Sequence, residues 1–162
     1  MYNSQDGSHP EKDILFLTET LETNTSLLKG LKVLVVDDNE DCLVLVTVIF
    51  EQYQVEIKSA ASVDEATELM EEWQPDVLIT NIYMVEKGGY LLIRSIREKE
   101  KLKATFLPAI AFIEYPENRV EALEAGFQDV TLKPFEPDEL VAQVAKLSLT
   151  TIHKLDKNRK LA

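Results

Sequence analysis

Four polar residues with complementary chemistry stand at the ends of three short apolar runs in this sequence. Asp37 and Asp38 end the first run, Asn81 ends the second and Lys133 ends the third. Two carboxylates can hold a cation between oxygen ligands, or one of them can form an ion pair with the lysine. An amide cannot act as a carboxylate nucleophile, because its nitrogen lone pair is delocalised into the carbonyl. The residues therefore predict a charged cluster whose member at position 81 is neutral and not nucleophilic.

The elements that position these residues follow from the alternation of short apolar runs with longer amphipathic stretches. Strands that alternate with helices of this length imply βαβ units and a parallel sheet. Polar residues after the first and third strands favour an α/β, doubly wound five-stranded sheet of order 2-1-3-4-5. The predicted strands are 32–36, 55–59, 76–80, 108–113 and 128–132, and the predicted helices are 40–53, 62–73, 89–100, 117–125 and 137–148.

Local signals mark the ends of several of these helices. Ser62 and Glu65 have the spacing of a capping box, in which the two side chains satisfy free N–H groups at a helix start. Pro137 suits the first turn of the last helix, where its missing N–H costs nothing. Gly126 follows a helical stretch and is typical of a helix stop.

The segments that carry the polar residues are 31–39, 81–90 and 133–135, with 126–128 ahead of the last. Together they resemble the receiver domain of bacterial response regulators, and 126–128 resembles receivers attached to hybrid sensor kinases. The resemblance implies a flavodoxin-like receiver fold, in which an aspartate takes a phosphoryl group from a histidine kinase. Asp37 and Asp38 match the acid pair that holds Mg²⁺ with that aspartate, and Lys133 matches the lysine that faces the phosphate. Asn81 stands at the acceptor position.

The sequence departs from the family pattern at further positions. Ile113 stands where the family has a Thr or Ser that bonds to the new phosphate. Val130 replaces an aromatic residue that turns inward on activation, and Val85 replaces a proline. The loss of several switch residues together indicates that the whole phosphorylation switch has been abandoned.

Two functions are compatible with this pattern. The one that we favour is a stand-alone degenerate receiver, a non-enzymatic adaptor in a two-component pathway that binds a histidine kinase or an output protein. The alternative is a Mg²⁺-dependent phosphorelay receiver, represented here by a non-phosphorylatable variant. With Asn81 neutral, an ion pair of Lys133 with Asp37 or Asp38 is favoured over a working Mg²⁺ site.

Composition sets the class of protein. The 162 residues suffice for one domain with a core and modest extensions. A net charge of −12 argues against nucleic acid as a direct partner. No segment approaches the roughly 20 apolar residues that span a bilayer, so we expect no membrane contact. Cys42 is the single cysteine, which fits a reducing compartment and predicts a cytoplasmic protein.

Three regions are expected along the chain. Residues 1–30 form an N-terminal extension with one short helix over 11–23, and residues 31–147 form the receiver domain. Residues 148–162 form a basic tail, either a solvated helix end or a segment that docks on an acidic face of this chain or of a partner. The charges of the tail are Lys154, Lys157, Arg159 and Lys160 against Asp156.

Two surfaces are candidates for partner binding. If Cys42, Leu45, Val46, Ile49 and Tyr53 face the sheet, the outward residues of the first predicted helix are Leu43, Val44 and Val48. An exposed apolar patch of this kind usually marks an interface. We expect residues 14–17 of this chain to cover it, and the alternative occupant is a second protomer or a partner protein. The other surface contains Val130 and the acidic side chains of Glu117 and Glu121.

Overall fold

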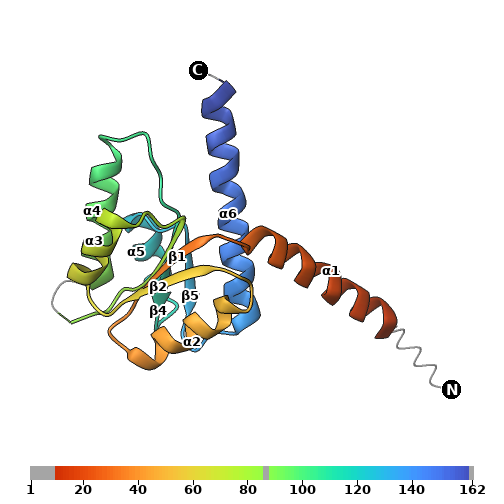
Figure 1. Ribbon diagram of the computed structural model, residues 1–162. Coiled ribbons are helices and arrows are strands. Elements are labelled where there is room, and N and C mark those ends of the chain that lie inside the picture. Colours follow the sequence, from red (N-terminus) through yellow and green to blue (C-terminus); the bar gives the residue numbers. More distant parts are fainter. Residues whose placement is uncertain (1–9, 86–87, 161–162) are drawn as a thin grey trace.

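A parallel five-stranded sheet forms the centre of the computed structural model, which describes residues 10–85 and 88–160, apart from side chains at 10, 14, 16–18 and 151–160. The strand order β2-β1-β3-β4-β5 confirms the predicted doubly wound, flavodoxin-like fold (Figure 1). The strands are β1 Lys32–Val36, β2 Glu56–Ala60, β3 Val77–Asn81, β4 Ala109–Ile113 and β5 Asp129–Leu132.

The register of the sheet brings the carboxyl ends of β1, β3, β4 and β5 to one edge. Val36 pairs with Thr80, and Asn81 pairs with Phe112. Ile113 pairs with Leu132. The residues that come at or directly after these strand ends, including Asp37 and Lys133, therefore meet at the same place.

Helices cover both faces of the sheet. The helices α2 (Glu40–Glu51) and α6 (Pro137–Lys160) lie on one face, and α3 (Val63–Glu72), α4 (Gly88–Glu100) and α5 (Asn118–Ala125) lie on the other. Strands buried on both faces are nearly all apolar, as expected for a parallel sheet. Among the described residues, no helix combines the length and the hydropathy that crossing a bilayer requires.

The three helix ends predicted from local signals are confirmed with one change in detail, whereas the last helix was predicted to end at residue 148 and continues to Lys160. Ser62 Oγ accepts a hydrogen bond from the N–H of Glu65 at 3.1 Å. The Glu65 carboxylate accepts from the N–H of Ala61 at 2.8 Å, one residue before the predicted partner. The helix α5 ends at Gly126, whose φ of 122° favours glycine, and α6 begins at Pro137.

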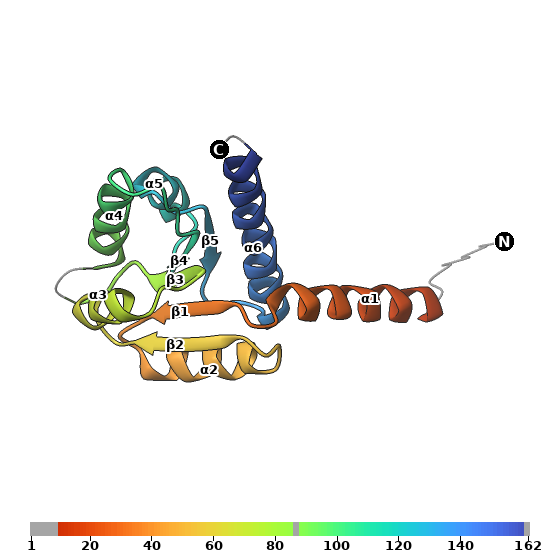
Figure 2. The ribbon, with the colours of Figure 1, turned by 45° about the horizontal axis from the view of Figure 1, so that its top comes forward.

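The helix α1 (Pro10–Leu28) is longer than the predicted helix over 11–23. Its C-terminal end packs beside α6, and the rest projects from the body in both ribbon views (Figures 1 and 2). It does not lie along α2, so the expectation that residues 14–17 cover the first helix of the domain was wrong. The reason is that the end of α1, where Leu28 is buried in the core, packs against α6, and this contact directs the helix away from α2.

Candidate functional site

Asp37 directly follows β1 and is completely buried. Its Oδ1 accepts a hydrogen bond from the N–H of Asn39 at 3.0 Å. Asn39 in turn caps α2, because its Oδ1 accepts from the N–H of Cys42 at 3.1 Å. A buried carboxylate needs several such partners to offset the loss of hydration. The turn after β1 supplies the first of them from the backbone.

Asn81 ends β3 and its side-chain amide links two loops of the site. Its Nδ2 donates to Asp37 Oδ1 at 3.3 Å and to the carbonyl oxygen of Tyr83 at 3.2 Å. The opposite orientation of the amide would place Oδ1 against both of these acceptors, so the network fixes the side chain as a donor. The Asn81 Oδ1 is buried and has no hydrogen-bond partner among the described residues.

Lys133 completes the cluster from the end of β5. Its Nζ lies 2.6 Å from Asp37 Oδ2, and its ammonium lies 5.2 Å from the centre of the Phe112 ring. The predicted ion pair is therefore formed with Asp37, whereas Asp38 is exposed. The N–H of Lys133 donates to the carbonyl oxygen of Ile113 at 2.8 Å, and this bond fixes the start of the loop between β5 and α6.

The cluster does not fit the Mg²⁺ ion that the fold family implies. Both oxygens of Asp37 are already engaged by protein donors, one of them by a cation. The amide presents its N–H to Asp37, where a metal-binding arrangement needs an oxygen. Binding of Mg²⁺ would require Asn81 to turn round and Lys133 to leave.

Cys42 lies beside the cluster, which sequence reasoning did not show. It lines a groove of about 570 Å³ together with Lys133 and Leu45. The pKa of the Cys42 thiol is raised to about 12, first by burial and then by the negative charge of Asp37, and Lys133 opposes the rise. The thiol is therefore protonated at neutral pH, and it contributes no nucleophile to the site. Its first-turn position in the helix after Asp37 was the signal that could have placed it there.

The structure shows where the residues that depart from the family pattern lie. Ile113 ends β4 at the same edge as Asn81 and is buried, so an aliphatic side chain replaces the hydroxyl there. Val130 was predicted to be part of an interaction surface, and this was wrong because it is buried in the core beneath α5. Glu117 and Glu121 are exposed, as predicted.

Tyr90 lies beside Glu121, and burial changes the properties of its hydroxyl group. The Tyr90 hydroxyl is buried and makes no hydrogen bond within the described part of the chain. The pKa of Tyr90 is raised, first by burial and then by the neighbouring Glu121. This phenol therefore stays neutral, and it adds no charge to the surface that contains Glu117 and Glu121.

The apolar surface of α2 is rotated relative to the prediction. Leu43 was predicted to face outward but is buried with Val46 and Ile49, whereas Leu45 is exposed. The Asn39 cap fixes where the helix starts. Leu43, Val46 and Phe50 then follow at intervals of three or four residues on the side of the helix that faces the core. The α2 stripe, as observed, consists of Val44, Leu45 and Val48, which are 62%, 47% and 51% exposed.

This rotation predicts different costs for two neighbouring leucines. Leu43→Ala should lower the free energy of unfolding by about 2 kcal/mol or more, because it leaves a cavity in the core. Leu45→Ala should change it by less than about 0.5 kcal/mol, because the side chain is half exposed. Urea unfolding followed by the fluorescence of the single tryptophan, Trp73, measures both. Equal costs for the two variants would contradict the observed phase of α2.

The fold and the site together define a class of protein. A doubly wound sheet carries polar residues at the ends of β1, β3 and β5, with a buried acid, Asp37, paired to a lysine, Lys133, and this is the layout of a receiver-type domain. Comparison with known proteins agrees, because residues 33–145 match the model of the response regulator receiver domain.

Relatives show the same domain in different contexts. An uncharacterized 14.6-kDa protein in the sodA1 3′ region of Leptolyngbya boryana is 36% identical over 75% of this chain and 93% of its own length. The sensor histidine kinase TmoS of Ectopseudomonas mendocina is 34% identical over 72% of this chain, which spans 12% of that protein. The Francisella response regulator 1452 receiver domain superposes with a TM-score of 0.68 at 28% identity, covering 75% of this chain and 99% of that one.

The chain belongs to the response regulator receiver family of two-component signalling. Receiver domains are signalling modules that interact with kinases, phosphotransfer proteins or output domains. This chain spans only 43% of another relative, the probable transcriptional regulator ycf27 of Guillardia theta. Kinase activity or transcriptional control therefore does not follow from the similarity to TmoS or ycf27.

Proposed function

We propose that this protein is a phosphorylation-independent interaction module of a two-component pathway. The observation that carries the proposal is the role of Asn81 as a hydrogen-bond donor. Its amide bridges Asp37 and the carbonyl of Tyr83, which gives the buried carboxylate a neutral donor at the acceptor position. The side chain that would receive a phosphoryl group in the family thus supports the resting structure instead.

The surroundings of Asn81 support the same function. Lys133, the lysine that would face a phosphate in the family, forms an ion pair with Asp37 instead. Ile113 supplies no hydroxyl at the end of β4. A site arranged in this way lacks both the acceptor carboxylate and the hydroxyl that would bond to a new phosphoryl group, so phosphorylation would not change its conformation in the usual way.

The proposed partners are proteins of the same pathway, either a histidine kinase or an output protein, met in the cytoplasm. The α2 stripe is the surface that best suits such contacts, since it is apolar and exposed beside the groove that contains Lys133. The protein would act by occupying this surface of its partner, and we expect no enzymatic activity of its own.

Treatment with a phosphoryl donor tests the proposal. We expect no covalent adduct when the protein is incubated with acetyl phosphate and Mg²⁺ and its intact mass is measured. The matched control is Asn81→Asp, which restores a carboxylate at the acceptor position. An adduct on the unmodified chain would overturn the proposal and favour the alternative, a Mg²⁺-dependent phosphorelay receiver that uses another residue.

A further inference from the structure

The helices α1 and α6 leave the body as two arms from a shared root. Leu28 at the end of α1 is buried in the same core cluster as Val141 and Val144 of α6. Beyond this root the two helices diverge in both ribbon views, and α6 continues past the sheet to Lys160 (Figure 2). Leu15 and Leu21 of α1 are 61% and 54% exposed, so the outer part of this helix is solvated in a single copy.

The sequence of α1 contains apolar residues at helical spacing. One series of residues recurs at intervals of three or four along the helix and is apolar except at Asn24. Its apolar members are Ile14, Leu17, Leu21 and Leu28. This spacing places them on one side of a helix, and the burial of Leu28 shows that this side is suited to packing. Leu21 also lines a groove of about 320 Å³ together with Tyr53 and Val141. An isolated helix of this length is only marginally stable in water, so the apolar face calls for a partner.

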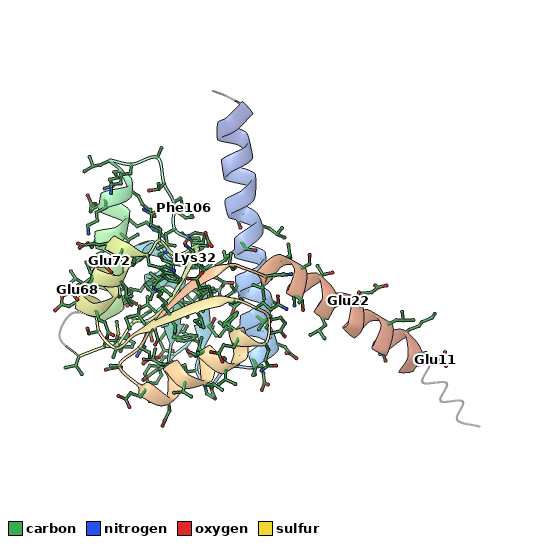
Figure 3. The ribbon with its side chains drawn as sticks, in the orientation of Figure 1. Glu11, Glu22, Lys32, Glu68, Glu72 and Phe106 are labelled. Atoms are coloured by element: carbon green, nitrogen blue, oxygen red, sulfur yellow. The ribbon has the colours of Figure 1, made fainter. Side chains whose placement is uncertain are left out.

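The two arms carry opposite charge. On α1, Glu11, Asp13, Glu19 and Glu22 oppose a single Lys12, and all of these side chains are exposed. Figure 3 shows Glu11 and Glu22 along the projecting helix, away from the sheet. Residues 148–160 of α6 contain four Lys or Arg and one Asp. None of the four α1 carboxylates forms an ion pair with another side chain in the described part of the chain.

We infer that the arms bind a second copy of this chain, with α1 of each copy packed antiparallel against the outer part of α6 of the other. The lengths agree with this arrangement. Glu11 precedes Leu28 by 17 residues and Lys157 follows Val141 by 16, so each charged tip lies about 25 Å from the root. The acidic tip of one copy therefore reaches the basic tip of its partner when the roots lie side by side.

A second copy suits these arms better than the chain's own helices. The arms diverge from a buried root, so the acidic tip of α1 cannot reach the basic tip of its own α6 while Leu28 stays in place. A twofold axis between the copies satisfies both arms at once, as in most homodimers. The inference rests on α1 and α6 alone and does not depend on the role proposed for Asn81.

Charge reversal on each arm provides the test, with the dimer dissociation constant measured by sedimentation equilibrium on the full chain. Each triple variant repels its own copies, and we expect its dissociation constant to rise about tenfold or more. An equimolar mixture of the two variants should form a heterodimer, because both of its contacts pair opposite charges. The first variant combines Glu11→Lys, Glu19→Lys and Glu22→Lys, and the second combines Lys154→Glu, Lys157→Glu and Lys160→Glu.

A matched triple reversal on α3, at the opposite side of the body, controls for the net-charge change of the first arm variant. It carries Glu68→Lys, Glu71→Lys and Glu72→Lys and should dimerise like the unmodified chain. Far-ultraviolet circular dichroism and the urea midpoint show that each variant is folded. A monomer at about 100 μM in low salt would overturn the inference, as would arm variants that dimerise normally. Failure of the two folded arm variants to associate when mixed would also overturn it.

Discussion

Asn81→Asp is expected to lower the free energy of unfolding by about 3 kcal/mol in the presence of EDTA. The amide donates to Asp37 and to the carbonyl of Tyr83, and a carboxylate can donate to neither. Two carboxylates near 4 Å apart also repel by about 4 kcal/mol at an effective dielectric constant of 20, an effect that Lys133 partly offsets. For a chain of this size the expected loss corresponds to a fall in Tm of about 10 °C.

Mg²⁺ should recover part of that loss in the variant and have little effect on the unmodified chain. The introduced carboxylate adds a charged oxygen ligand where the natural site has a neutral amide, so the variant can bind the cation. If about 10 mM Mg²⁺ is tenfold above the dissociation constant, the gain is about 1.4 kcal/mol. Thermal melts with EDTA and with Mg²⁺ measure both effects.

Asn81→Ala separates the two causes of the loss. It removes the donor without adding a charge, so it should cost about 1–3 kcal/mol and show no response to Mg²⁺. A melt of Asn81→Asp in EDTA that matches the unmodified protein would contradict the role of the amide. An equal Mg²⁺ response of Asn81→Ala and Asn81→Asp would contradict the assignment of the new carboxylate as a ligand.

The cluster could be predicted from the sequence because strand ends are well specified. Parallel strands with apolar runs must bring their carboxyl ends to one edge, so Asp37, Asn81 and Lys133 had to meet. The choice of Asp37 over Asp38 as the partner of Lys133 depends on which residue of the turn points inward. That choice follows from the backbone at Asn39, which the sequence pattern does not specify.

The helix faces were harder to predict, for identifiable reasons. Nearly every residue of α2 between Cys42 and Phe50 is apolar, so the spacing alone permits two different buried faces. The N-cap at Asn39 decides between them and buries Leu43. The direction of α1 depends on the burial of Leu28 beside α6, a tertiary contact that no local pattern reveals.

Gly89→Ala is expected to cost about 3 kcal/mol or more. A Cβ at this position would lie 2.3 Å from the carbonyl oxygen of Asn81 and 2.9 Å from the Cα of Ile82. Both are backbone atoms, so no flexible side chain can move aside, and the start of α4 must shift. The N–H of Gly89 donates to the carbonyl oxygen of Ile82 at 2.8 Å, and this bond holds the two backbones together.

Gly30→Ala is the matched control, because it separates steric overlap from backbone strain. Gly30 has a φ of +77°, but a Cβ added there would have nothing within 4 Å, so strain alone should cost about 1–2 kcal/mol. Urea unfolding followed by Trp73 fluorescence compares the two variants. A smaller cost for Gly89→Ala than for Gly30→Ala would contradict the close approach of α4 to β3.

The Gly89 variant also connects stability to the site. The atom that the new methyl group strikes belongs to Asn81 itself, so we expect relief of the overlap to move the residue whose amide bridges Asp37 and Tyr83. The side-chain NH₂ resonances of Asn81 should therefore shift in Gly89→Ala and remain in place in Gly30→Ala. Unchanged resonances in the first variant would mean that α4 alone absorbs the overlap, and the glycine would then be required by the helix and not by the amide bridge.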